Sequence, residues 1–133
     1  MKFIFVLNFL IIASPFAVER KSSELVEVNK KIAAIMGMMH LPGMGVSTLA
    51  GKGDYKSKYF KQASSDFVLQ TRKMATVKHP DKAFRAFNDE MLKCLKTFEE
   101  AVAAEKSEEI RQSWKAVMTT CQSCHSVYHA KQK

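Results

Sequence analysis

The sequence predicts an all-α fold, a single antiparallel bundle of four helices. With 133 residues the chain has the length of one domain. Beyond residue 21 the apolar residues recur at intervals of three and four, which is the period of an amphipathic helix. Short stretches rich in Pro, Gly or capping residues separate four such segments, and helices with short connections pack most simply as antiparallel neighbours.

The N-terminus carries the pattern of a secretory signal peptide. A single lysine precedes an apolar run from Phe3 to Ala13, and small residues follow up to Ala17. This run is shorter than the roughly 20 apolar residues that a membrane-spanning helix requires. We therefore expect residues 1–17 to be removed on export, with an uncleaved N-terminal anchor as the alternative. The folded domain is then expected over residues 22–130.

Charge and cysteine content limit the possible partners and the class of protein. Lys and Arg number 21 against 13 Asp and Glu, which gives a formal net charge of +8 at pH 7, and the predicted signal peptide accounts for one of the lysines. A basic surface favours acidic proteins or anionic surfaces, although a lysine-rich face is also an ordinary solvated surface. We expect no nucleic-acid partner for an exported chain. Its three cysteines cannot all pair, so a disulfide framework is not expected.

The first predicted helix begins at Ser22. The stretch 42–45, Pro-Gly-Met-Gly, is expected to end it because Pro and Gly disrupt helices, and a loop is expected to continue to Gly53. The apolar stripe of this helix consists of Leu25, Val28, Ile32, Ile35 and Met39.

A proline separates the second and third predicted helices. Asp54 is the expected N-cap of the second helix, which should end at His79 because Pro80 steers the residue before it out of the helical region. Pro80 is then expected to be the first residue of the third helix, where its missing N–H costs nothing. The inner faces consist of Phe60, Ala63, Phe67, Met74 and Val77 in the second helix and Phe84, Phe87, Met91, Leu95, Phe98 and Val102 in the third.

The fourth predicted helix begins at Ser107, a capping residue followed by two glutamates that favour the positive end of the helix dipole. Its apolar seam passes through a Cys-x-x-Cys-His motif, so the motif replaces core residues on the inward face. The seam consists of Ile110, Trp114, Val117, Cys121, Cys124 and Tyr128. Cys94 stands alone on the third helix and is expected to be a small buried thiol.

The cluster Cys121-Gln122-Ser123-Cys124-His125 suits the attachment of a haem. At about 100° per residue, the two thiols and the imidazole fall within an arc of about 100° on one side of the helix. Two thiols on one side can reach both vinyl edges of one porphyrin while the imidazole reaches its iron. The pattern therefore predicts covalent haem binding by Cys121 and Cys124, with His125 as the iron ligand.

Two other chemistries compete for the same residues. Zinc would use Cys121, Cys124 and either His125 or His129, but a closed structural site needs four ligands and the sequence has no second Cys-x-x-Cys pair. Dithiol exchange usually places its first cysteine at a helix N-terminus, where the dipole lowers the thiol pKa, whereas this motif falls late in a helix. Both alternatives stay open at this point, as do two structural cysteines beside an incidental histidine.

With this motif on the last of four helices, the chain resembles the class II c-type cytochromes, namely cytochrome c prime and its low-spin methionine-ligated relatives. The resemblance covers residues 22–130, and its specific part is Trp114, Val117, the Cys-x-x-Cys-His motif and Tyr128. It implies a periplasmic protein with one haem c, bound covalently through two thioethers and covered on its distal face by the first helix. It also implies electron transport and a possible homodimer, and the basic charge suits an acidic redox partner.

The resemblance leaves the residue on the distal side of the iron open. In low-spin members a Met from the first helix ligates the iron, and here Met36 is the predicted ligand. The other candidates are Met38, Met39, Met44 and His40, and an open site would be walled by Ile32 and Val28, with Ala33 at the position that the family register gives. His129 stands where many members carry Arg or Lys, so the charge beside the proximal ligand is expected to titrate near neutral pH.

Two functions follow from these two forms of the distal site. A Met ligand makes the protein an electron carrier, whereas five-coordinate, high-spin iron makes it a haem protein that binds NO or CO. A zinc-binding helical bundle is the third interpretation. An enzyme is not expected, because the sequence shows no recognisable distal acid–base pair.

Overall fold

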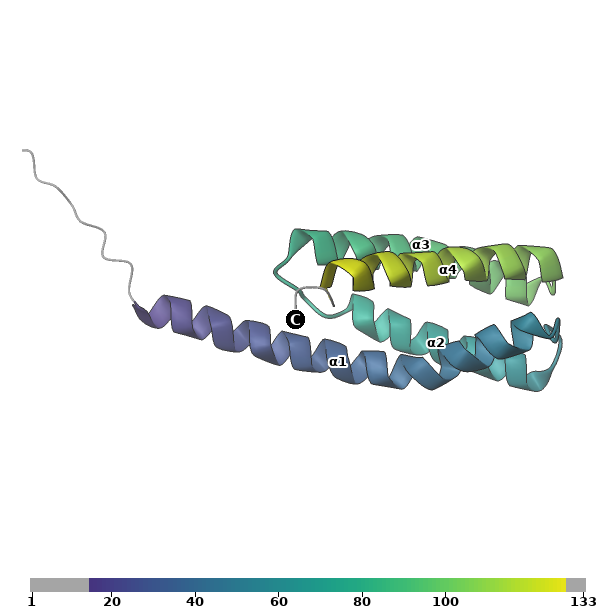
Figure 1. Ribbon diagram of the computed structural model, residues 1–133, viewed down its shortest axis with the longest axis horizontal. Coiled ribbons are helices and arrows are strands. Elements are labelled where there is room, and N and C mark those ends of the chain that lie inside the picture. The colour runs from purple at the N-terminus through teal and green to yellow at the C-terminus, as the bar shows by residue number, and fades with distance from the viewer. Residues whose placement is uncertain (1–14, 129–133) are drawn as a thin grey trace, which may run out of the picture.

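The computed structural model describes residues 15–128, with side chains from residue 22 onward. Within this part of the chain the structure is all-helical, with four helices and no strand, as predicted. Most of the predicted signal peptide, and His129, lie outside the described residues. The helices are α1 (Pro15–Gly51), α2 (Lys58–Ala75), α3 (Lys82–Ala103) and α4 (Ser107–Tyr128) (Figure 1).

The helices pack in two pairs. α1 packs mainly on α2 and α3 mainly on α4, and contacts between α2 and α3 join the pairs. In Figure 1 the N-terminal part of α1 extends beyond the other helices. All four helices contribute to the core, because each amphipathic helix needs partners to bury its apolar stripe. The largest fully buried side chains are Val46, Phe60, Leu95, Phe98, Ile110 and Val117.

The prediction that Pro42 ends the first helix is wrong, because α1 continues through this residue to Gly51. An internal proline removes a helical hydrogen bond and costs about 3 kcal/mol or more. Packing beyond the proline offsets this cost, since Val46 is fully buried and α1 approaches α2 so closely that a Cβ at Gly45 would lie 3.2 Å from the Cβ of Ala63. α1 bends part-way along its length in Figure 1, as helices do at a proline.

The loop after α1 is shorter than predicted, and Asp54 is not the N-cap of α2. Gly53 has a positive φ of 71°, and the Asp54 N–H donates to the carbonyl of Leu49 at 2.9 Å, so these residues close the C-terminus of α1. The N-cap of α2 is Ser57, whose Oγ accepts a hydrogen bond from the Phe60 N–H at 3.1 Å. Asp54 therefore ends one helix instead of beginning the next.

The connection between α2 and α3 also differs from the prediction by a few residues. α2 ends at Ala75, where the Thr76 hydroxyl donates to the carbonyl of Lys73 at 2.8 Å. Pro80 is not the first residue of α3, because Asp81 is the N-cap and its side chain accepts a hydrogen bond from the Ala83 N–H. An aspartate in extended backbone conformation satisfies an N–H at the start of a helix, which proline cannot do.

Most predicted core positions are buried or half-buried, and the seam of α4 is confirmed. Two predicted core positions differ. Val77 lies beyond the end of α2, and Leu25 is exposed because it lies in the N-terminal part of α1, which extends beyond the other helices (Figure 1). Besides predicted core residues, α2 also buries Ser64, Val68 and Thr71, which were not predicted. On α4 the side chains of Ile110, Trp114 and Val117 are buried, and those of Cys121, Cys124 and Tyr128 are half-buried.

α1 also has the length and composition of a membrane-spanning helix. Ser22–Gly51 contains a stretch apolar enough to cross a membrane, and 11% of that stretch is buried. A signal sequence near an N-terminus and a core helix of a soluble protein share these properties. The observation is compatible with export and with the alternative of an N-terminal anchor.

Candidate functional site

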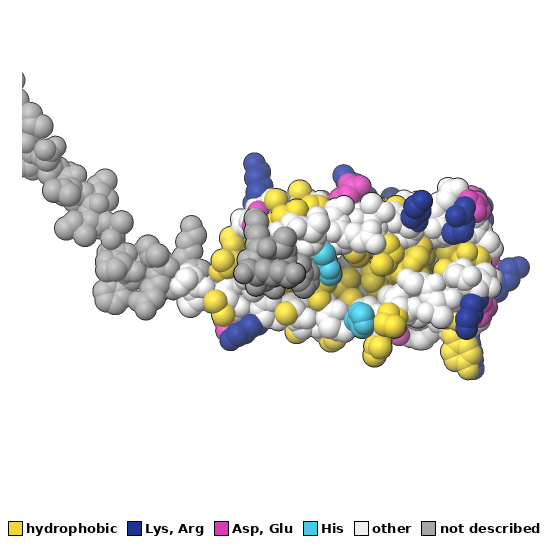
Figure 2. Space-filling view, viewed as in Figure 1, with side chains coloured by type: hydrophobic (Ala, Val, Ile, Leu, Met, Phe, Trp, Pro, Cys, Tyr) yellow, Lys and Arg dark blue, Asp and Glu magenta, His cyan; other side chains and the backbone are white. Residues whose placement is uncertain are grey.

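A cavity of about 370 Å³ lies beside the Cys-x-x-Cys-His motif and is lined by all four helices. Cofactor sites have volumes of about 300–1,000 Å³. Figure 2 shows a hollow of apolar side chains between the helices, with histidine side chains at its edges. Among the described side chains that line it there is no Lys, Arg, Asp or Glu. The lining residues are Met36, Met39, His40, Gly43, Met44, Ser47 and Thr48 from α1, Phe67, Thr71 and Met74 from α2, Phe84, Phe87, Asn88 and Met91 from α3, and Met118, Thr120, Cys121, Cys124 and His125 from α4.

α4 brings the three predicted haem-binding residues to this cavity. The Trp114 Nε1–H donates to the Oγ of Ser47 at 3.1 Å, which fixes α4 against α1 near the cavity. Cys121 and Cys124 are half-buried free thiols. His125 is exposed and also lines the cavity, so its imidazole lies at the cavity mouth.

Burial raises the pKa of both thiols in the motif. Desolvation is the main cause that raises the pKa of Cys121 to about 11, and the neighbouring Cys124 thiol adds to it. Desolvation also raises the pKa of Cys124. Cysteines that exchange disulfides have the opposite property, a lowered thiol pKa. The environment of this motif therefore does not favour dithiol exchange.

The described residues give no support to the zinc interpretation. Among the described side chains, no group of three or more His, Cys, Asp and Glu is placed to hold a metal ion. A structural zinc site needs four such ligands. His129, which that interpretation can use as a ligand, lies outside the described residues.

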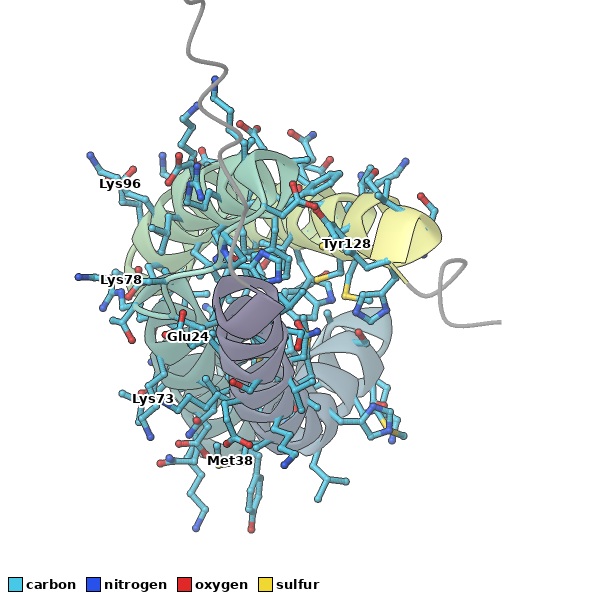
Figure 3. All side chains as sticks on the ribbon, turned by 90° about the vertical axis from the view of Figure 1, so that its left-hand side faces the viewer. Glu24, Met38, Lys73, Lys78, Lys96 and Tyr128 are labelled. Atoms are coloured by element: carbon cyan, nitrogen blue, oxygen red, sulfur yellow. The ribbon has the colours of Figure 1, made fainter. Side chains whose placement is uncertain are left out.

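α1 forms the wall across from the motif, and most of the predicted distal candidates lie on it. Met36, Met39, His40 and Met44 line the cavity. Met38 does not line it, has 48% of its surface exposed, and points away from the bundle in Figure 3. The lining also does not include the residues proposed to wall an open site, namely Val28, Ile32 and Ala33. The part of α1 that lines the cavity therefore lies closer to the C-terminus of this helix than the sequence predicted.

Apart from Met44, the part of this wall beyond residue 42 was not predicted from the sequence. Gly43, Ser47 and Thr48 line the cavity, whereas a loop was expected there. Gly43 brings the backbone close to α2, since a Cβ at this position would lie 3.3 Å from ring carbons of Phe67. The interval of three or four continues from Met36 through these positions, and this period was the signal that could have found them.

Comparison with models of known protein families finds no match to the chain, and comparison with curated proteins finds none either. The resemblance to class II c-type cytochromes therefore depends on the residues of the motif and on its place in α4, the last of the four described helices.

Proposed function

We propose that this protein is a periplasmic electron carrier with one haem c inside an antiparallel four-helix bundle. Cys121 and Cys124 would hold the haem through two thioethers, and His125 would be the proximal iron ligand. The observation that carries the proposal is that both thiols and this imidazole line one apolar cavity. We assign the protein no enzymatic reaction.

The residues of the cavity fit a haem. A porphyrin is a broad apolar ring with a polar edge, and the lining combines aromatic rings and thioethers with a few hydroxyl and amide groups. Cys121 and Cys124 are free thiols, the form that thioether attachment requires. Their positions on one side of α4 suit the two vinyl edges of one ring.

The chain would contribute binding, orientation and exclusion of water. A haem supplies reversible one-electron chemistry at its iron. α4 offers two thiols and an imidazole within little more than one helical turn, so the helix itself sets the orientation of the ring. Phe67 and Phe84 are buried beside the cavity, and such apolar surroundings are one of the means by which a protein tunes a haem potential.

On the distal side we propose Met36 as the second axial ligand. Its thioether lines the cavity from α1 and is half-buried. A Met and His pair of axial ligands raises the reduction potential of a haem, which suits a carrier.

The partner that we propose is an acidic redox protein. The formal net charge of the chain is +8, and complementary charge steers the encounter of redox partners. Lys73, Lys78 and Lys96 project outward from the bundle in Figure 3. The rate of electron exchange with an acidic partner should fall as ionic strength rises.

Retention of haem by the purified, exported protein tests the covalent attachment. The red colour should remain with the protein after acid–acetone extraction, and a double Cys121→Ser and Cys124→Ser variant should lose it. Cys94→Ser is the matched control, because Cys94 is also a half-buried free thiol but does not line the cavity. Haem that washes out of the parent protein would refute the proposal.

Optical spectra test the distal ligand and separate the carrier from the gas binder. The ferric protein should show the weak long-wavelength band of Met ligation, and Met36→Leu should remove it while Met38→Leu keeps it. A high-spin spectrum in the parent protein, with CO bound by the reduced form, would replace the carrier by a five-coordinate haem protein that binds small gases.

A further inference from the structure

The end of α4 is tied to the start of α3. The Tyr128 hydroxyl donates to the Oδ2 of Asp81 at 2.8 Å. The Tyr128 ring packs edge-on against Phe84 and Phe87, with centroids 5.5 Å and 6.4 Å away. Both phenylalanines also line the cavity. Tyr128, labelled in Figure 3, therefore joins the last turn of α4 to a wall of the candidate site.

Asp81 is itself held in place. Its Oδ1 accepts a hydrogen bond from the Ala83 N–H at 2.8 Å, which makes it the N-cap of α3. Its own N–H donates to the Nδ1 of His79 at 3.0 Å. His79 is buried and stacks on Phe84 with ring centroids 4.4 Å apart. The carboxylate that accepts the hydrogen bond from the Tyr128 hydroxyl is thus held at the N-terminus of α3.

The electrostatics of the two partners agree with this contact. The hydrogen bond from Tyr128 is the main cause that lowers the pKa of Asp81. Burial, followed by the hydrogen bond to Asp81, raises the pKa of Tyr128 to about 12. Both directions favour a neutral phenol that donates to an ionised carboxylate over the whole neutral range.

We infer that Asp81 and Tyr128 are positioning residues for His125, because the hydrogen bond between them fixes the last turn of α4 and with it the direction of the imidazole. The last four carbonyls of a helix have no partner within the helix, and such ends fray. Tyr128 follows His125 by three residues, about 60° away around the helix. A contact that holds Tyr128 in place therefore also sets the rotation of His125. The effect at the iron rests on the proposed function.

Two variants of the full-length haem protein test this inference. Tyr128→Phe removes the hydroxyl and keeps the ring. Asp81→Asn keeps the N-cap of α3, since Asn caps helices as well as Asp does, but replaces Oδ2, the acceptor of the Tyr128 hydrogen bond, with an amide nitrogen that only donates. Tyr59→Phe is the matched control for the first, because 67% of Tyr59 is exposed, and Asp89→Asn at an exposed site of α3 is the control for the second.

Amide hydrogen exchange over residues 122–128 reports the tether without reference to iron. Both variants should exchange about three- to tenfold faster there than the parent protein, the effect of losing one charge-assisted hydrogen bond near the surface. The electron paramagnetic resonance of the ferric form and the midpoint potential report the proximal imidazole. Both should shift in the two variants and stay unchanged in the controls.

Unchanged exchange in Tyr128→Phe would show that the tether does not hold α4. Faster exchange with an unchanged resonance and potential would show a structural contact that does not position His125. Either result overturns the inference. A failure of the proposed function is a separate result, because it appears as loss of haem from the parent protein in acid–acetone.

Discussion

Replacing Gly37 by Ala should stabilise the protein, whereas the same change at Gly45 should not. Both glycines lie inside α1, and alanine is more favourable than glycine in a helix by about 0.8–1.0 kcal/mol. A Cβ at Gly37 meets no atom within 4 Å, so the whole gain is available there. A Cβ at Gly45 would lie 3.2 Å from the Cβ of Ala63, which is tighter than ordinary packing.

These contacts set the size of the two effects. For Gly37→Ala we expect the free energy of unfolding to rise by about 0.5–1 kcal/mol, which corresponds to an increase in Tm of about 3–6 °C. At Gly45 the same gain competes with about 1–3 kcal/mol for forcing extra volume between packed helices. The net result there is a loss of about 0–2 kcal/mol.

Urea unfolding followed by circular dichroism measures both free energies on the same scale. Equal stabilisation by the two substitutions would refute the close approach of α1 and α2, and with it the reason given for a helix that continues through Pro42. A destabilising Gly37→Ala would instead show that residue 37 is not at an open helical position.

Three further predictions follow from single contacts. Trp114→Phe should lower the free energy of unfolding by about 1–2 kcal/mol, because it removes the 3.1 Å hydrogen bond to Ser47; urea unfolding measures this, and an unchanged value would contradict it. In the haem-free chain, Cys121 should react with iodoacetamide more slowly when folded than in urea, because burial raises its pKa to about 11; equal rates of alkylation would contradict its burial. The stability from Asp81 should be present above its ordinary pKa of 3.8 and be lost as pH falls through its lowered folded-state pKa. The stability from Tyr128 should be present below its ordinary pKa of 10 and be lost as pH rises to about 12. Unfolding curves of Tyr128→Phe should lack the alkaline dependence and show a weaker acid dependence, because the Ala83 N–H still lowers the pKa of Asp81; curves that match those of the parent protein would contradict both.

The sequence predicts α4 well because local and tertiary preferences agree there. Ser107 and the glutamates after it favour a helix start, and the interval of four and three continues to Tyr128. Burial of Trp114 then follows from the period alone. Local and tertiary preferences do not conflict in this segment, so the start of the helix and its inward face could be predicted directly from the sequence.

The C-terminal end of α1 could not be predicted in the same way, because the local and tertiary preferences of this segment conflict. Pro42 and the nearby glycines favour a turn, and their combined cost in a helix is several kcal/mol, at about 3 for the proline and about 1 for each glycine. Tertiary contacts outweigh that preference, among them the packing of Val46 in the core and the close contact of Gly45 with Ala63. Neither contact is visible until the position of α2 is known.

The candidate site also has one part that local sequence predicts and one part that depends on tertiary packing. Cys121, Cys124 and His125 could be named from sequence because their chemistry lies in one helical turn. The wall across the cavity depends on how α1 is rotated against the bundle, and neighbouring residues of that helix differ in direction by about 100°. Met38 and Met39 illustrate this, since one is 48% exposed and the other 7%.

The burial of the α1 side chains gives a physical order to the distal candidates. Met39 is part of the core, with 7% of its surface exposed, so turning its sulfur toward an iron would leave a cavity behind, at a cost of some kcal/mol. His40 and Met44 are exposed, and His40 would have to give up the hydration of a polar ring. Met36 is half-buried at the cavity wall and has less of either cost. We therefore expect Met36→Leu to leave the distal site open and not to bring His40 onto the iron. A bis-histidine spectrum in that variant would contradict this ranking of the distal candidates.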